Sequence, residues 1–552
     1  MKNIKYLLLT VILIGYTACN EIEDVDLDPA EMVVELPELT SGDADFSNYV
    51  AVGASFTAGF TDQALFIAAQ ENSFPNFLAQ QFAKVGGGNF VQPLMNDNNG
   101  GLLFMGTPIQ SPRFFFDGAG PATLPASPTT EVTNVLSGSF NNMGIPGAKS
   151  FHFLANGYGS LAGVPIQAAN PYFARMASNS NASILEDALA QGPTFFTLSE
   201  VGGNDVLGYA LSGGTGMDQT GNPNAMSYGP ADITDPGLFG QVFGGLVAAM
   251  TQNGAKGVVT TVPDITSLAN FTTIPHDPLD PTNPSFGPLI PTLNGIFGQL
   301  NLVYAFLESQ GVPNATERSI VFAEDAASAV VIKDESLADL TANITGVFLT
   351  NPAFPFFVES LGLPAAAAPL VADLLGTTYG QTRQATSDDL LLLASLPVIG
   401  TVNEAAVGAL LGQNIPLEVA GQFSVEGITL PLADQWVLLP SEQAEIAAAT
   451  SAYNATIESV ANSNPNVALA DLRAVLEQAA TSGYSYDDYT MTTDLVFGGL
   501  ISLDGVHLTA RGYGLMAREF LSAIDGAFGS NFIEAGATPD AGDLPTNYPE
   551  GL

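Results

Sequence analysis

A serine stands at the end of an apolar, β-branched run close to the start of the chain. The run Val50–Val52 leads into the turn Gly53–Ser55, and an amphipathic helical pattern begins soon after it. A strand that enters a tight turn in front of a helix can present a hydroxyl as a nucleophile, although the same pattern also describes an ordinary turn with a capping serine. A serine hydroxyl is a weak nucleophile on its own, so this interpretation requires a base and oxyanion donors elsewhere in the chain.

Three later segments carry residues suited to those tasks. Residues 142–147 form a glycine-rich turn, and residues 200–205 close an apolar strand with Asn-Asp. Residues 503–508 place an aspartate three positions before a histidine, directly in front of the last helical pattern. An Asp and a His at this spacing can lie on one turn, where the carboxylate fixes the histidine tautomer. A side-chain amide and backbone N–H groups suit the negative charge that develops on an acyl oxygen.

In this order, the four segments resemble the characteristic blocks of the SGNH/GDSL hydrolase superfamily. They read Gly-x-Ser-x-Thr-x-Gly, Asn-x-Gly-x-x-Gly, Gly-x-Asn-Asp and Asp-x-x-His, and they frame most of the chain. The resemblance implies that Ser55 is the nucleophile, His507 the general base and Asp504 the residue that orients the base. It also implies an oxyanion hole formed by the Ser55 N–H, the Gly144 N–H and the Asn204 side-chain amide.

One position departs from the family pattern. Ala54 stands where the family's Gly-Asp-Ser has its aspartate, which removes a carboxylate beside the nucleophile but leaves the nucleophile in place. This departure supports a rival hypothesis of another class, a surface binding lipoprotein that keeps the SGNH scaffold without turnover. The chain contains no Gly-x-Ser-x-Gly, which argues against the nucleophile elbow of the α/β-hydrolases.

Only two other histidines compete for the role of base. His152 follows the second block and is expected to have a structural or substrate-contact role, whereas His276 reads as a loop residue. Three dispersed histidines and one cysteine do not form a zinc-binding pattern, so we expect neither a metal nor an organic cofactor.

Four β-type runs alternate with helical patterns, which favours an α/β fold whose parallel sheet is covered on both faces. The resemblance implies, more specifically, a flavodoxin-like three-layer α/β/α sandwich with a central parallel sheet, the SGNH hydrolase fold. In such sheets ligands bind at the carboxyl ends of the strands. The β-type runs are Asn48–Gly53, Thr194–Val201, Gly257–Val262 and Asn466–Leu472, and the helical patterns include Ala64–Val85, Ser441–Asn462 and Thr509–Phe528.

The expected hydrolase domain spans residues 46–530 and contains a long, mostly helical insertion. From about residue 265 to 438 the chain is rich in Pro, Ala and Leu and is too long for a loop. Because it leaves from the end of a strand, it is expected either to overhang the active site as a cap that binds acyl groups or to form a second core. Residues 531–552 are expected to be a C-terminal tail, poorly ordered from Ala535 onward.

The N-terminus resembles that of an exported bacterial lipoprotein. Residues 1–18 combine two lysines with an apolar run and small residues, as a signal peptide does. Cys19, the only cysteine, follows directly, and the resemblance to a lipobox implies that its thiol is diacylated and anchors the protein in a membrane. Residues 19–45 form an acidic tether, similar to outer-membrane sorting and surface-export signals. We therefore expect an outer-membrane lipoprotein that faces either the periplasm or the cell surface.

Charge excludes one class of partner. The chain has 13 Lys and Arg against 55 Asp and Glu, for a net charge of −42. Because binding to phosphate backbones needs a basic surface, nucleic acid is not an expected partner. The resemblance to the SGNH/GDSL hydrolases implies a serine esterase or lipase that acts on carboxylic esters of a small molecule, lipid or carbohydrate. A polysaccharide O-acetyl esterase is the alternative within the same chemistry.

Overall fold

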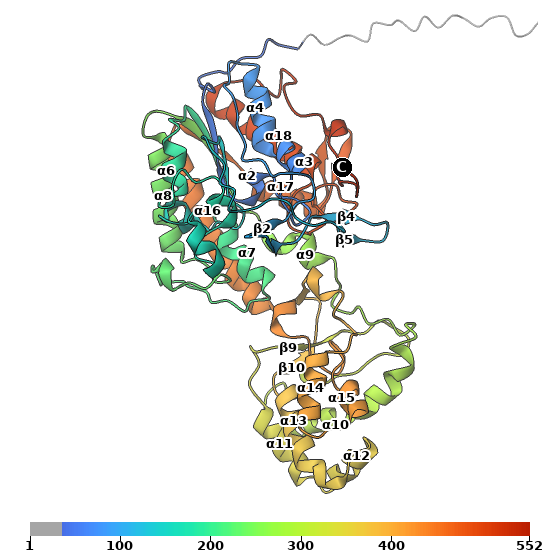
Figure 1. Cartoon of the computed structure of the whole chain (residues 1–552). Helices are drawn as coiled ribbons and strands as arrows, with labels where there is room; N and C mark the ends of the chain where they lie inside the picture. Colours follow the sequence, from blue (N-terminus) through green and yellow to red (C-terminus); the bar gives the residue numbers. More distant parts are fainter. Residues whose placement is uncertain (1–35) are drawn as a thin grey trace, which may run out of the picture.

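A five-stranded parallel sheet forms the centre of the upper of two lobes in the computed structural model, which describes residues 36–552 (Figure 1). Every pair of neighbouring strands in this sheet is parallel, and the two central strands are buried along their whole length. Near-continuous apolar runs are what a sheet covered on both faces requires. The α/β fold with a parallel sheet is therefore confirmed. The strands are β1 (Tyr49–Gly53), β6 (Asn142–Gly144), β7 (Phe195–Ser199), β8 (Lys256–Thr260) and β13 (Val467–Ala470).

The order of the strands creates a position where a ligand can bind. The sheet runs β13-β8-β7-β1-β6. The first strand in the chain, β1, has the second, β6, on one side and the third, β7, on the other, and β8 and β13 follow beyond β7. This 2-1-3-4-5 order is that of flavodoxin-like sheets, in which the connections leave in opposite directions from the first and third strands. A crevice opens between the carboxyl ends of those two strands, here β1 and β7.

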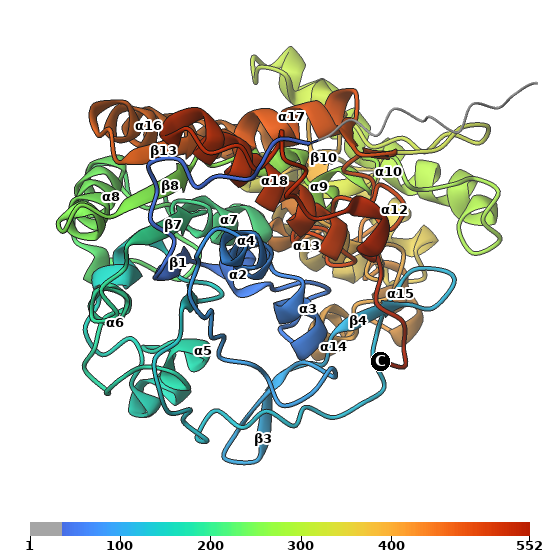
Figure 2. The same ribbon diagram turned by 90° about the horizontal axis from the view of Figure 1, so that it is seen from above.

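Helices cover the sheet on both faces (Figure 2). On one face, α4 (Phe74–Ala83) packs beside the last long helix, α18 (Ala510–Phe528). On the other, α8 (Pro236–Thr251) packs against α16 (Pro440–Ser463). The last two predicted helical patterns match α16 and α18 closely. The first, 64–85, forms two helices instead of one, α3 (Ile67–Glu71) and α4, because Pro75 lacks an N–H and sits in the first turn of a new helix.

The insertion forms the lower lobe of Figure 1 and has a hydrophobic core of its own, separate from the core around the sheet. The chain enters this lobe after β8 and α9 (Ala269–Thr272), and it returns through β12 (Val437–Leu438) into α16. The expectation of a second core thus matches the packing. The other elements of the lobe are α10 (Ile290–Ser309), β9 (Val331–Lys333), α11 (Thr341–Thr350), α12 (Phe354–Ser360), α13 (Ala368–Tyr379), β10 (Thr382–Gln384), β11 (Leu390–Leu391), α14 (Glu404–Gly412) and α15 (Leu417–Gln422).

The C-terminal segment is not the poorly ordered tail expected from its composition. Leu544 and Tyr548 are buried, and the Tyr548 ring packs edge-on against Phe66 with centroids 5.0 Å apart. The buried Arg113 guanidinium donates a hydrogen bond to the Pro549 carbonyl at 2.6 Å. A few well-placed aromatic and cationic contacts therefore hold a segment whose Pro, Gly and Asp content alone indicates disorder.

The predictions for the N-terminus fall almost entirely on residues that the structure does not describe. The signal peptide, Cys19 and the first part of the acidic tether lie outside the described residues 36–552. Within that range, no single helix has both the length and the apolar character to cross a membrane. One pair, Phe354–Ser360 with Ala365–Tyr379, meets these criteria only jointly and bends by 116°.

Candidate active site

Ser55 lies at the carboxyl end of β1, as the first residue of the short helix α2 (Ser55–Ala58). Only 7% of its surface is exposed. The turn is closed by the Phe60 N–H, which donates to the Ser55 carbonyl at 2.9 Å. The neighbouring strand β6 packs directly on α2, since a Cβ atom on Gly144 would lie 2.2 Å from the Ala58 nitrogen. Glycine at position 144 thus allows the two elements to approach and holds the serine turn against the sheet.

Asp504 and His507 form a hydrogen-bonded pair on one tight turn. The His507 Nδ1 and the Asp504 Oδ2 are 2.8 Å apart, as the Asp-x-x-His spacing predicts. The turn also places the backbone N–H groups of Val506 and His507 at 2.9 and 2.8 Å from Asp504 Oδ1. Gly505 takes φ +76°, a conformation that side chains disfavour, and a Cβ there would lie 2.8 Å from the Asn270 nitrogen. The geometry of the pair therefore depends on this glycine.

The electrostatic environment keeps Asp504 ionised. Burial alone would raise the pKa of its carboxyl, but the His507 imidazole and the surrounding N–H donors hold that pKa well below its usual range. Besides the two donors on its own turn, Asp504 accepts from the Gln63 N–H at 2.9 Å and the Ser502 hydroxyl at 3.0 Å. A permanent carboxylate at Nδ1 leaves Nε2 of His507 as the free basic nitrogen and stabilises an imidazolium when one forms.

Aromatic contacts place the His507 ring beside the serine turn. Its centroid lies 5.8 Å from the ring of Phe56, the residue after Ser55, and 4.6 Å from the ring of Phe60. The Leu503 N–H also donates to Asp62 Oδ1 at 3.0 Å, which ties the histidine loop to the segment after α2. Within residues 36–552 no hydrogen bond joins the Ser55 hydroxyl to the imidazole. Catalytic hydrogen bonds commonly tighten only when substrate is present, so the missing bond does not argue against a serine and base pair at this place.

The side chain of Asn204 reaches the same place from the start of the helix that follows β7. Asn204 begins α7 (Asn204–Leu211) and lines the same cavity as Ser55. One of its amide hydrogens is donated to the Ala148 carbonyl at 3.0 Å, which fixes the side chain and leaves the second hydrogen for another acceptor. The loop that carries Ala148 is anchored in turn, because Ser150 donates through both its N–H and its hydroxyl to the buried Asp205 at 2.8 and 2.7 Å.

Gly144 does not offer the N–H that the oxyanion hole was expected to use. Gly144 is buried in β6, and its N–H already donates to Asn142 Oδ1 at 3.0 Å. The prediction for Gly144 therefore conflicts with the geometry. Gly147, three residues further on, lies on the exposed turn after β6 with φ +80°. The Asn-x-Gly-x-x-Gly pattern contains both glycines. Because β6 ends at Gly144, that glycine is buried in the strand, whereas Gly147 lies beyond the strand at the edge of the sheet.

Glu200 is a site residue that the sequence analysis did not assign. Its Oε1 accepts the backbone N–H groups of Ala54 and Thr57 at 2.5 and 2.9 Å, one on each side of Ser55. Its Oε2 accepts the Ser199 hydroxyl at 3.1 Å. Burial raises the pKa of the Glu200 carboxyl to about 7, against the opposing effect of these hydrogen bonds. Ala54 brings no carboxyl group to the turn, but Glu200, directly after β7, supplies one and thereby fixes the backbone on both sides of Ser55.

In the esterase proposed below, Glu200→Ala is expected to lower kcat about 10- to 100-fold with a smaller change in KM, because the serine turn loses the acceptor that fixes it. Two N–H groups left without an acceptor also cost about 2–3 kcal/mol of stability. Glu200→Gln keeps an acceptor oxygen and should restore most of kcat. Steady-state kinetics of the two variants on one ester test this positioning role, and equal losses in both would contradict it.

The raised pKa of Glu200 predicts how the stability of the folded protein changes with pH. Between about pH 5 and 7 the folded protein holds a proton on Glu200 that the unfolded chain releases, so stability falls as the pH rises through 7. Glu200→Gln has no such proton, and its unfolding free energy should fall less over this range. Denaturant unfolding at pH 5 and pH 8 measures the difference, and parallel pH profiles would show that Glu200 does not titrate as described.

The other two histidines are not part of this site. His152 accepts the Lys149 N–H through Nδ1 at 3.0 Å and stacks on the Tyr158 ring at 4.2 Å. Burial, with the help of Lys149, lowers the pKa of His152 to about 4, so this histidine is a neutral packing residue. His276 lies in the lower lobe, 3.8 Å from Asp277.

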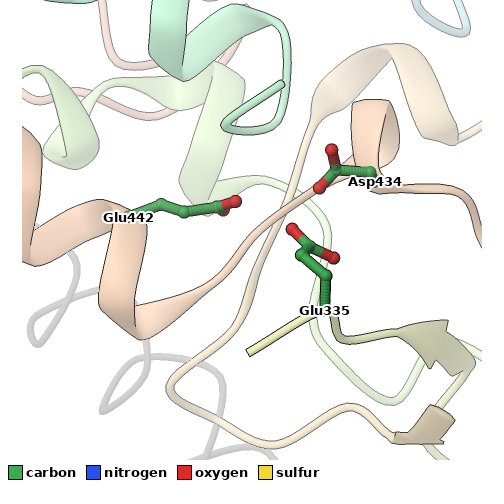
Figure 3. A group of neighbouring side chains, drawn as sticks. All are labelled: Glu335, Asp434 and Glu442. Atoms are coloured by element: carbon green, nitrogen blue, oxygen red, sulfur yellow. The ribbon is translucent and has the colours of Figure 1, made fainter. Parts of the chain in front are cut away.

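Among the described residues, one cluster has the ligand types of a cation site. Glu335, Asp434 and Glu442 direct carboxylate oxygens toward one another within 4.8 Å, where the two lobes join (Figure 3). Burial, with the like charges of the neighbouring carboxylates, raises the pKa of Asp434 to about 7 and that of Glu442 to about 8. Protons held near neutral pH therefore relieve the repulsion within the cluster. None of the three residues lines the cavity at Ser55.

An apolar cavity opens beside Ser55. It runs along the carboxyl edge of the sheet, past the end of β8, to the helices that follow β13. Of the predicted insertion, only Ile265 and Leu268, at its base, line this cavity. The insertion supports the site in one further way, because the Asn270 N–H of α9 donates to the Gly505 carbonyl at 2.9 Å. The apolar surface next to Ser55 thus belongs to the sheet lobe and not to an overhanging cap.

The structure brings together Ser55, Asn204 and the Asp504–His507 pair from three distant segments and adds Glu200, while the N–H of Gly144 is already used within its own strand. No family model, curated protein or solved structure matches this chain. The assignment of the site therefore rests on its geometry and on the chemistry of its residues.

Proposed function

We propose that this protein is a serine esterase of the SGNH type, which hydrolyses carboxylic esters through an acyl-enzyme on Ser55. The observation that carries the proposal is the convergence at the carboxyl edge of the sheet of a serine, a part-buried Asp–His pair and a partly free amide. The strand order 2-1-3-4-5 and the two-faced helix layers support the three-layer SGNH fold as its scaffold.

The chemistry follows from the position of each group. Ser55 Oγ attacks the ester carbonyl while Nε2 of His507 takes the hydroxyl proton, and Asp504 stabilises the imidazolium. The oxyanion is stabilised by the Ser55 N–H, which has no partner inside α2, and by the second amide hydrogen of Asn204, with the Gly147 N–H as a third donor. Each such donor typically lowers the barrier by about 3 kcal/mol.

The remaining steps return the site to its resting state. When the tetrahedral intermediate collapses, the ester C–O bond breaks and His507 gives its proton to the departing alcohol. A water molecule then attacks the acyl group on Ser55, with His507 again accepting the proton. Collapse of the second intermediate returns that proton to Ser55 and releases the carboxylic acid.

Hydrolysis of p-nitrophenyl esters by the purified chain tests the proposal. We expect saturable release of nitrophenolate that stops when Ser55 is changed to alanine. A folded protein that releases none, from any ester in a series of acyl lengths, would instead favour the rival function, a binding lipoprotein without turnover. Activity confined to acetyl groups on polysaccharides would favour the O-acetyl esterase.

We also propose that the protein is a lipoprotein of the outer membrane. The proposal is supported by the two lysines, the short apolar run and the single cysteine at position 19. Mass spectrometry of the mature N-terminus is expected to show a diacylated Cys19, and globomycin should block the processing. A Cys19→Ser protein that is still lipidated would contradict the anchor.

A further inference from the structure

The cavity beside Ser55 is polar only where it meets the carboxyl ends of the strands. The polar side chains that line it are those of Ser55, Glu200, Asn204 and Thr261, and all belong to the strand ends or follow them directly. The remaining wall is apolar and, apart from the Phe56 ring, aliphatic, and the space has a volume of about 90 Å³. Cavities lined by aliphatic side chains exclude water and bind apolar groups. The space therefore suits a hydrocarbon chain whose polar end lies at Ser55.

The wall is made by well-packed elements of the sheet lobe. One side comes from α17 (Leu472–Thr481), through Val475 and Leu476, and another from α18, through Leu515 and Met516. Leu515, Met516 and Leu476 are only 1, 3 and 6% exposed, so their side chains are held by the core and the cavity is formed in advance. The residues on either side of His507, Val506 and Leu508, complete the wall.

The position of the cavity argues against a simple packing gap. A gap in a core has no reason to end at a serine hydroxyl flanked by a free amide hydrogen and by the loop of the Asp–His pair. In an acyl-enzyme the carbonyl carbon is bonded to Ser55 Oγ, so the attached chain must leave from this point. The cavity is the apolar space that starts there.

We infer that this cavity binds the acyl chain of the substrate, and that the substrates are esters of linear medium-chain carboxylic acids rather than acetyl esters. The inference rests on the proposed esterase function, since it identifies the acyl group that Ser55 receives. The alcohol part leaves toward the open side of the site. The insertion contributes only Ile265 and Leu268, at its own start, to the wall of the cavity, so it does not select the chain.

A series of p-nitrophenyl esters from acetate to octanoate tests the inference. Each CH₂ group buried in the cavity should raise kcat/KM about fourfold until the space is full, so hexanoate should exceed acetate on the order of a hundredfold. If acetate is hydrolysed as well as the longer esters, the cavity does not bind the chain, although the esterase proposal still holds. Absence of turnover at every length would overturn both.

Substitutions in the wall of the cavity test whether the acyl chain of the substrate lies there. Leu476→Phe fills the cavity and should lower the octanoate-to-acetate ratio of kcat/KM roughly tenfold, while turnover of acetate shows that the catalytic groups are intact. Val475→Phe, at a partly exposed position on the same helix, provides a second variant in case the first packs poorly. Leu302→Phe, the same change at a 65% exposed position of the lower lobe, is the matched control. An unchanged ratio in both cavity variants would overturn the inference.

A binding measurement examines the cavity independently of turnover. Octanoic acid, the product of the longest ester, should bind the wild-type protein in a calorimetric titration and bind Leu476→Phe roughly tenfold more weakly. The Leu302→Phe control should bind it as the wild type does. Equal affinity for octanoic acid in all three proteins would place the chain elsewhere.

Discussion

Changing Ser55 to alanine is expected to lower kcat for ester hydrolysis by a factor on the order of 10⁵ to 10⁶, because the acyl-enzyme can no longer form. His507→Ala should be nearly as damaging, and the double variant no worse than either single one, since nucleophile and base act as one unit. Initial rates with one nitrophenyl ester, at enzyme concentrations high enough to detect the residual activity, measure all three proteins.

The control for this experiment is an exposed serine. Ser309→Ala, in the lower lobe, makes the same chemical change at a distance from the site and should leave kcat unaltered. Unfolding by denaturant would show whether Ser55→Ala keeps the wild-type stability. If the effects of Ser55→Ala and His507→Ala multiplied in the double variant, the two residues would not act in the same step, and the mechanism would have to be revised.

Asp504→Asn should lower kcat by about 10⁴ while largely preserving the fold. The amide oxygen can still accept the N–H groups of Val506 and His507, but the amide nitrogen then faces His507 Nδ1 and the Gln63 N–H, where an acceptor is needed. The imidazole is therefore held in the wrong tautomer, with its Nε2 protonated. Asp494→Asn, at an exposed position of the same region, is the matched control.

The difference in unfolding free energy between the wild type and Asp504→Asn should depend on pH with a definite sign. The depressed pKa of Asp504 stabilises the folded protein above the ordinary carboxyl pKa, near pH 4, and this contribution disappears as the pH falls toward the folded-state value. The variant lacks it, so wild type and variant should differ most at neutral pH and converge in acid. A difference that grew on acidification would show that Asp504 is not held as a carboxylate.

Local patterns predicted much of the fold and the pairwise contacts within the site. The spacing of Asp504 and His507 predicts a shared turn because the two residues are close in sequence, and the apolar runs of the central strands are distinct enough to be found without a structure. Strand β6 was not predicted, since three residues of the type Asn-Met-Gly have no strand pattern and are placed only by pairing with β1. The position of this strand also determines which glycine N–H reaches the sheet edge.

Contacts between distant segments could not be predicted. Glu200 reads as the polar end of a strand, and its role depends on the N–H groups of Ala54 and Thr57, which lie almost 150 residues earlier and are brought near by sheet formation. The C-terminal segment was misjudged for the same reason, because its order comes from Tyr548 and its contact with Phe66. Whether the insertion is a cap or a second core likewise could not be predicted, because it depends on whether its apolar side chains pack on the site or on one another.

Labelling with a fluorophosphonate tests the central claim most directly, because the reagent phosphonylates a serine only when a base and an oxyanion hole activate it. Intact mass and peptide mapping of the folded wild-type protein are expected to show one adduct, on Ser55. Ser55→Ala should carry none, His507→Ala should react far more slowly, and heat-unfolded wild-type protein should not react. A folded wild-type protein that acquires no adduct, or acquires it at another residue, would contradict the account of Ser55 as a catalytic nucleophile.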